Sequence, residues 1–142
     1  TATACKAQVD LIKNGWIVPG AHINGIGGDT VGKTELELDI LPRSRIVVEY
    51  FDQCATEGEI QRFTKEEAKK QVYAELYELI TGAKTARENE KQITLYDSVG
   101  IALEDYSAIL FTYKLANRYK LGEELNFTPI IKDPKNLISG LL

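Results

Sequence analysis

The feature that most constrains the fold is a run of apolar residues within residues 45–50. Ile46, Val47 and Val48 follow one another without an intervening polar side chain. β-branched residues favour extended backbone, and a run without alternation is typical of a strand that is buried on both faces. Such strands occur in parallel sheets that helices cover on both sides. The sequence therefore predicts an α/β fold.

The rest of the chain alternates strand and helix patterns around this run. Residues 21–24 and 93–96 are short and apolar, and a glycine follows each within four residues, so both predict strands with sharp exits. Apolar residues at helical spacing then predict a long helix that ends at Gly122, after the cations Arg118 and Lys120. Strands that alternate with helices indicate a mostly parallel sheet with flanking helices.

Two further helices are predicted from capping signals. Thr34 is placed to cap a short helix over residues 35–41. Thr64 and Glu67 form a capping box, and the amphipathic pattern that follows predicts one continuous helix up to Gly82.

The remaining segments predict loops or the ends of elements. Residues 51–63 are irregular and polar, and residues 84–91 predict a polar loop. Residues 1–4 are small and compatible with the end of a strand, and Trp16 is expected to pack beneath the sheet.

A glycine-rich stretch follows the strand predicted over residues 21–24. Four glycines occur within residues 25–32, where the backbone can turn sharply or approach a ligand closely. One carboxylate, Asp29, and one ammonium, Lys33, stand among them. Ligands of open α/β sheets bind beyond the carboxyl ends of the strands, so this exit is a candidate site. A surface turn with solvated charges is the alternative.

The order of residues in this stretch is specific. His-Ile-Asn-Gly-Ile-Gly-Gly-Asp-x-x-Gly-Lys-Thr-Glu-Leu, over residues 22–36, resembles the ornithine cyclodeaminase/mu-crystallin family. Glu-Gly-Glu-Ile-Gln over residues 57–61 and Asp-Ser-Val-Gly-Ile-Ala-Leu-Glu-Asp-Tyr over residues 97–106 agree with it in order and spacing. The resemblance covers the whole chain, which corresponds to about the C-terminal half of such a protein. It implies the C-terminal part of a Rossmann-type NAD(P)-binding domain, followed by a C-terminal helix and tail.

The resemblance also implies a set of site residues. Asp29 matches the catalytic aspartate, which contacts substrate and exchanges a proton, a role that suits a pKa raised toward neutrality by partial burial. Val99 matches a second substrate contact. Positions that match contacts to the cofactor NAD are Ala2, His22, Ile23, Asn24, Gly25, Lys33 and Ser98. Simpler roles exist for two of them: His22 as a core histidine and Ser98 as a helix cap. No metal site is implied.

The implied activity is that of an ornithine cyclodeaminase, which converts L-ornithine to L-proline and ammonia with transient hydride transfer to bound NAD. Val99 and residues 57–61 favour this branch, whereas Val31 departs from it where proline is usual. The alternatives are an NAD-dependent amino-acid dehydrogenase or imine reductase of the same family, and a non-catalytic binding protein of the mu-crystallin type.

The chain contains no GxGxxG sequence, the fingerprint of a dinucleotide's pyrophosphate loop. In the family that loop lies in the preceding half of the Rossmann domain, and a further N-terminal domain holds the substrate carboxylate and forms a homodimer interface. We therefore expect these 142 residues to be inactive alone.

Composition limits the other possibilities. A chain of 142 residues predicts a single domain over residues 1–142. Its net charge of −4 argues against a nucleic-acid surface, and no apolar run is long enough to span a bilayer. Methionine is absent, which suggests a piece of a larger protein. Cys5 and Cys54 lack metal-ligand spacing and no secretory signal is visible, so we expect reduced thiols in a cytoplasmic protein.

Overall fold

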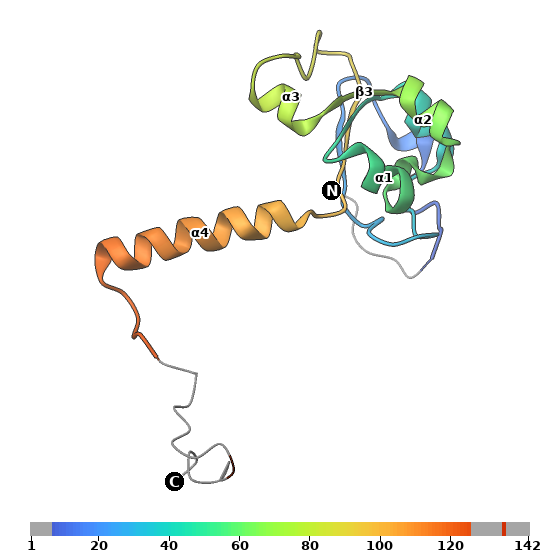
Figure 1. The fold of residues 1–142 in the computed structure, drawn as a ribbon. Coiled ribbons are helices and arrows are strands. Elements are labelled where there is room, and N and C mark those ends of the chain that lie inside the picture. Colours follow the sequence, from blue (N-terminus) through green and yellow to red (C-terminus); the bar gives the residue numbers. More distant parts are fainter. Residues whose placement is uncertain (1–6, 126–134, 136–142) are drawn as a thin grey trace. The chain divides into compact units, whose positions relative to one another are not determined.

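A parallel sheet of four strands forms the centre of the fold (Figure 1). The computed structural model describes residues 7–125 and residue 135. In space the strands lie in the order β1-β4-β2-β3, and every pairing is parallel. Their bounds are β1 (His22–Gly25), β2 (Arg45–Val48), β3 (Val72–Glu75) and β4 (Thr94–Asp97). The predicted α/β class is confirmed, and so are the strands expected around residues 21–24, 45–50 and 93–96.

Short helices connect the strands. The α-helices are α1 (Phe51–Glu57), α2 (Lys65–Gln71), α3 (Leu76–Ile80) and α4 (Ala102–Tyr119). The 3-10 helices are η1 (Asn14–Trp16), η2 (Leu38–Arg43) and η3 (Glu59–Arg62). The capping box predicted at Thr64 and Glu67 is present at the start of α2, and the long helix predicted before Gly122 is α4.

The two faces of the sheet differ in what covers them. On one face, Ile23, Ile46, Val48 and Leu95 pack in the core against buried residues of the connecting segments, namely Leu36, Ile40, Leu41, Cys54, Ile60 and Ala68. On the other face, Val47 lies with Leu76 and Leu79 of α3 around a cavity of about 340 Å³. Successive strand residues point to opposite faces, so β2 is buried on both sides, as its apolar run predicts.

The single helix predicted from Thr64 to Gly82 is wrong, because a strand interrupts it. The chain leaves helix after Gln71 and runs as β3 beside β2, with Ile46 opposite Val72 and Val47 opposite Ala74. Hydrogen bonds to β2 and the burial of Ala74 favour the strand over the helical spacing of the apolar residues.

Three smaller expectations also change. Residues 51–63, predicted to be irregular, form α1 and η3. Residues 35–37 do not begin a helix; Leu36 bridges Ile12 in extended conformation and η2 starts at Leu38. Trp16 is 65% exposed and does not pack beneath the sheet, because η1 holds it at the surface.

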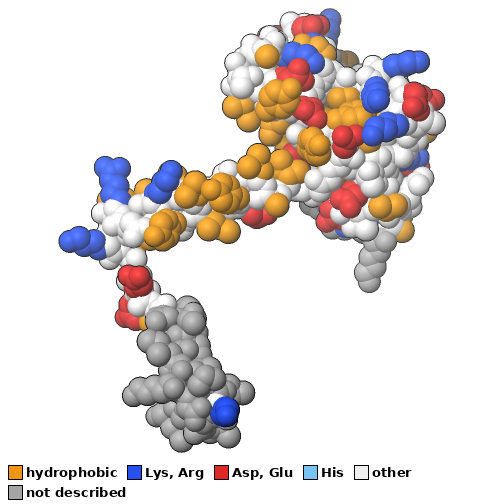
Figure 2. Space-filling view, in the orientation of Figure 1, with side chains coloured by type: hydrophobic (Ala, Val, Ile, Leu, Met, Phe, Trp, Pro, Cys, Tyr) orange, Lys and Arg blue, Asp and Glu red, His pale blue; other side chains and the backbone are white. Residues whose placement is uncertain are grey.

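The chain divides into two compact units, one ending at Glu104 and the other beginning at Asp105. The second unit holds most of α4, along which apolar side chains gather at the surface, among them Tyr106, Ile109 and Tyr113 (Figure 2). Within residues 7–125, no helix combines the length and the apolar character that a membrane crossing needs. The strand end expected at residues 1–4, with Ala2, lies outside the described residues, as do Cys5 and residues 126–134 and 136–142 of the C-terminal tail.

Candidate active site

The exits of β1 and β4 lie side by side at the carboxyl edge of the sheet. Gly25 is opposite Asp97, and the Ser98 amide donates to the Gly25 carbonyl at 3.0 Å. The loop that carries Asp29 and the loop that carries Ser98 and Val99 therefore leave the sheet from neighbouring strands. This is the edge at which open α/β sheets bind their ligands.

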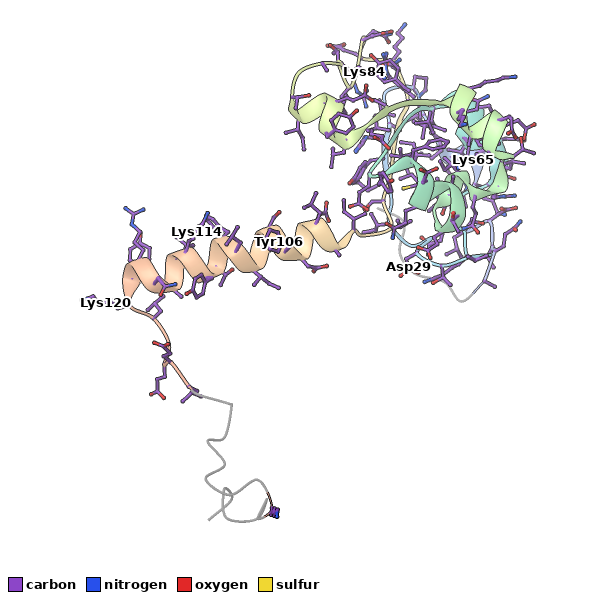
Figure 3. All side chains as sticks on the ribbon, in the orientation of Figure 1. Asp29, Lys65, Lys84, Tyr106, Lys114 and Lys120 are labelled. Carbon is purple, nitrogen blue, oxygen red and sulfur yellow. The ribbon has the colours of Figure 1, made fainter. Side chains whose placement is uncertain are left out.

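Asp29 and Lys33 form an ion pair in the loop that follows β1. The Lys33 Nζ lies 2.6 Å from Asp29 Oδ1, and the Asp29 side chain is 49% exposed. Figure 3 labels Asp29 on its loop. The hydrogen bond from Lys33 lowers the pKa of Asp29 below its ordinary value. The raised pKa expected for a catalytic Asp29 is thus not found in this chain, because the carboxylate is exposed and paired with a cation. It is ionised at neutral pH and able to accept a proton.

Gln61 of η3 holds the turn on which this pair stands. The Lys33 amide donates to the Thr30 carbonyl at 3.0 Å, and Gly32 has φ of 79°. The Gly32 amide donates to Gln61 Oε1 at 2.6 Å. Gln61 Nε2 donates to the carbonyls of Lys33, at 3.1 Å, and Glu57, at 2.8 Å. One side-chain amide therefore connects η3 to both sides of the turn.

Two buried carboxylates tie the same segments to the sheet. Asp97 accepts hydrogen bonds from the amides of Glu59, at 2.9 Å, and Ile60, at 3.0 Å. Glu59 in turn accepts from the amides of Glu35, at 2.7 Å, and Leu36, at 3.2 Å. Burial raises the pKa of both Glu59 and Asp97 to about 7, against these hydrogen bonds, which lower it. β4, η3 and the chain after the Asp29 loop thus form one connected frame.

The exit of β4 has its own carboxylate. Glu49, buried at the end of β2, accepts from the amides of Val99, at 3.1 Å, and Gly100, at 2.7 Å. Val99 is half-buried and packs against the core. Ser98 does not cap a helix, since α4 begins four residues later at Ala102.

The predicted β1 residues face in two directions. His22 is exposed and its ring nitrogens lie 2.7 Å from Thr94 Oγ1 and 3.1 Å from Asn24 Oδ1, so it is not a core histidine. His22 and Asn24 line the cavity beside α3, whereas Ile23 is buried in the core on the opposite face. The structure thus places the Ile23 side chain on the opposite face of the sheet from those of His22 and Asn24.

Other sites are not apparent in the described part of the chain. No group of three or more His, Cys, Asp or Glu side chains there could hold a metal ion. Cys54 is a free thiol, and burial raises its pKa to about 12, so it is not a reactive nucleophile.

Gln61, Glu59, Asp97 and Glu49 have no site role in the sequence prediction. The Glu-Gly-Glu-Ile-Gln motif over residues 57–61 was a signal for two of them, but their partners lie 23 to 29 residues away in the chain. The sequence shows that the motif exists and does not show what it contacts.

Comparison with known proteins identifies the family. The model of the ornithine cyclodeaminase/mu-crystallin family matches residues 1–119. An ornithine cyclodeaminase of Agrobacterium fabrum is 40% identical over 142 residues, which are the whole chain and 39% of that relative.

Two solved structures share the fold at 33% identity. One is an archaeal alanine dehydrogenase dimer with bound NAD, with a TM-score of 0.79 over 89% of this chain and 40% of that one. The other is the Thermococcus litoralis Δ1-pyrroline-2-carboxylate reductase with NADH and L-proline, with a TM-score of 0.77 over 86% of this chain and 39% of that one. The chain therefore spans about two fifths of the length of its relatives, and it belongs to the ornithine cyclodeaminase/mu-crystallin family.

Proposed function

We propose that this chain is part of an NAD-dependent ornithine cyclodeaminase, a lyase of proline biosynthesis that converts L-ornithine to L-proline and ammonia. The observation that carries the proposal is the exposed Asp29 carboxylate, held by Lys33 on a glycine-rich loop at the carboxyl edge of a parallel sheet. The 40% identity to an ornithine cyclodeaminase over the whole chain supports this choice of activity. The proposal concerns the full-length protein as a cytoplasmic homodimer.

The residues at this edge suit the nicotinamide end of NAD. Lys33 supplies an ammonium, Ser98 a hydroxyl, and the exit of β1 supplies backbone groups of Asn24 and Gly25. His22, Ile23 and Ala2 complete the proposed cofactor contacts, the first two through the β1 backbone. NAD, when bound, accepts a hydride from the α-carbon of the substrate and later returns it.

In this proposal Asp29 transfers the proton. It is ionised and accepts a proton from the α-amino nitrogen as the α-carbon loses its hydride and an imine forms. The side-chain amine of ornithine attacks the imine carbon and passes one of its protons to the α-nitrogen. Asp29 returns its own proton to the same nitrogen, which leaves as ammonia, and the ring nitrogen remains double-bonded to the carbon as a protonated cyclic imine. Return of the hydride to that carbon gives L-proline. Lys33 keeps Asp29 ionised in the absence of substrate.

Val99 is the proposed contact for the aliphatic part of ornithine. Its side chain is apolar and Glu49 fixes its backbone at the exit of β4. An apolar neighbour offers the terminal amine no competing hydrogen bond, so the amine is free to fold back on the imine carbon.

The second candidate is an amino-acid dehydrogenase or imine reductase of the same family. The alanine dehydrogenase and the pyrroline-carboxylate reductase share this fold at 33% identity. A binding protein of the mu-crystallin type is the non-catalytic alternative. Turnover of the full-length protein with L-ornithine and L-alanine side by side separates them. Proline from ornithine supports the cyclodeaminase, NADH accumulation from alanine supports a dehydrogenase, and no turnover supports a binding protein.

Asp29→Asn tests the proposed catalytic residue. Asparagine keeps the shape of the side chain but cannot accept the proton. General acid–base catalysis contributes about 10²- to 10⁴-fold, so kcat of the full-length protein is expected to fall by at least about 10²-fold, with little change in NAD affinity. Asp39→Asn, at an exposed aspartate of η2, is the matched control and should leave kcat unchanged. Near-normal turnover of Asp29→Asn would show that another group moves the proton.

A further inference from the structure

The turn over residues 30–33 directly follows Asp29 and carries Lys33, yet few contacts within the turn hold it. Gly32 has a left-handed φ of 79°, and a Cβ at this position would meet nothing within 4 Å. Val31 at its tip is 68% exposed. Within the turn, one backbone hydrogen bond, from Lys33 to Thr30, closes the loop. Its geometry therefore depends on contacts from elsewhere in the chain.

Gln61 supplies those contacts. Gln61 lies 28 residues from Lys33 in the sequence. Its Oε1 accepts from the Gly32 amide, and its Nε2 donates to the Lys33 carbonyl. The same Nε2 also donates to the carbonyls of Glu57 and Gly58, at 2.8 and 2.9 Å, which anchors the side chain on its own segment. The amide thus spans from η3 to the turn.

Buried hydrogen bonds hold the η3 segment that carries Gln61 to the sheet. Asp97 at the end of β4 accepts from the amides of Glu59 and Ile60, directly before Gln61. Glu59 then accepts from the amides of Glu35 and Leu36, directly after the turn. Asp97 and Glu59 are each fully buried, so these contacts are protected from water.

We propose that Gln61 is a positioning residue for Asp29 and Lys33. Its side-chain amide closes the turn of residues 30–33 and sets the spacing of the two charged groups relative to the exit of β4. The effect of Gln61 on catalysis rests on the proposed function.

Gln61→Met in the 142-residue chain tests the structural part. Methionine has a similar length but neither donates nor accepts a strong hydrogen bond. The Gly32 amide should exchange with solvent at least about 10-fold faster, because its acceptor is gone. The pKa of Asp29, followed by NMR titration, should rise toward its ordinary value as the spacing to Lys33 loosens. Gln92→Met is the matched control, since Gln92 Oε1 accepts from the Glu88 amide at 2.9 Å in the polar loop before β4.

Gln61→Asn provides a second test if the methionine variant does not fold. Asparagine keeps both amide groups but is one methylene shorter, so it cannot contact Gly32 and Glu57 together. The same faster exchange and the same rise in the pKa of Asp29 are expected. Wild-type exchange at Gly32 in either folded variant, together with an unchanged pKa of Asp29, would overturn the proposal.

The full-length protein tests the catalytic consequence. A small misplacement of a reacting group costs up to about 10²-fold in rate, so Gln61→Met should lower kcat by about 10- to 100-fold with KM for NAD changed less than about 2-fold. The acid limb of the kcat profile should move to higher pH, because Asp29 loses its base form at higher pH. A loss of kcat without this movement would reject the catalytic role. If the wild type makes no proline, the proposed function fails, while exchange and titration still decide the positioning role.

Discussion

At the scale of single residues, close packing against carboxylates explains two glycines near the site, Gly27 and Gly58. A Cβ on Gly27 would collide with the Glu35 carboxylate, and a Cβ on Gly58 would meet Asp97 Oδ2 at 2.6 Å. Neither glycine has a positive φ. They are therefore required because the backbone passes directly over buried carboxyl groups, and not because the turn needs a left-handed residue.

Gly27→Ala should accordingly destabilise the chain. The added methyl group must displace the buried Glu35 side chain, and overpacking of this kind costs about 1–3 kcal/mol in the free energy of unfolding. Gly15→Ala is the control, because a Cβ at Gly15 meets nothing within 4 Å and its φ is not positive. Urea unfolding of both variants at the same pH measures the difference. Equal stability of the two variants would show that Glu35 moves aside at no cost.

At the scale of elements, hydrogen bonds from backbone amides to carboxylates connect short segments of secondary structure. The strands each have four residues, and η3 joins β4 through Asp97 and the Glu35–Leu36 backbone through Glu59. Asn14 and Phe51 are held in the same manner, by the side chains of Glu37 and Glu75. Hydrogen bonds from backbone amides to these acids connect elements that share little regular pairing.

This arrangement predicts a dependence of stability on pH. The pKa of Glu59 and of Asp97 is about 7 in the folded chain, above the ordinary values of 4.5 and 3.8. The folded chain therefore binds more protons than the unfolded chain between about pH 4 and 7, and the stabilisation is lost as the pH rises through about 7. Each of the two groups contributes up to about two pKa units between pH 5 and 8, so the free energy of unfolding should fall by roughly 3–5 kcal/mol over this range.

Denaturant unfolding across this range measures the effect. Glu59→Gln should reduce the slope, and Glu66→Gln, at an exposed side chain of α2, should not. Hydrogen bonds lower the pKa of Asp52, Glu67 and Glu78 below their ordinary values. The stability that these acids contribute is lost only as the pH falls below about 4.5, outside the range from pH 5 to 8. Stability that rises from pH 5 to 8 would contradict the burial of two ionising carboxyl groups.

At the scale of the whole molecule, the chain carries one side of the proposed site. It holds Asp29, Lys33, Ser98 and Val99 at one sheet edge, and it contains no GxGxxG sequence for a pyrophosphate. Its 142 residues correspond to 39% of the length of the Agrobacterium fabrum relative. The remaining contacts to cofactor and substrate are therefore proposed to come from outside these residues.

The 142-residue chain alone is expected to form no proline from L-ornithine and NAD. A colorimetric or mass-spectrometric proline assay with the full-length protein as the positive comparison measures this. Unfolding and amide exchange of the same sample show whether the chain is folded when it is assayed. Proline formation by the chain alone would show that no contacts from outside these residues are needed for catalysis.

The sequence by itself determined the α/β class, three of the four strands, the capping box of α2 and the long helix α4. These features follow from residue spacing, turns and caps, which act over a few neighbouring positions. The family motifs likewise single out the Asp29 loop and the exit of β4, and the roles of these residues in a site stay predictions.

Only the tertiary structure decided the remaining features, because their partners are distant in sequence. β3 interrupts a helical pattern since β2, more than 20 residues earlier, offers it a pairing edge. The low pKa of Asp29 depends on how the turn presents Lys33, and the turn depends on Gln61, 29 residues from Gly32. The roles of Glu59 and Asp97 come from burial and from amides 23 to 38 residues away, which local patterns do not encode.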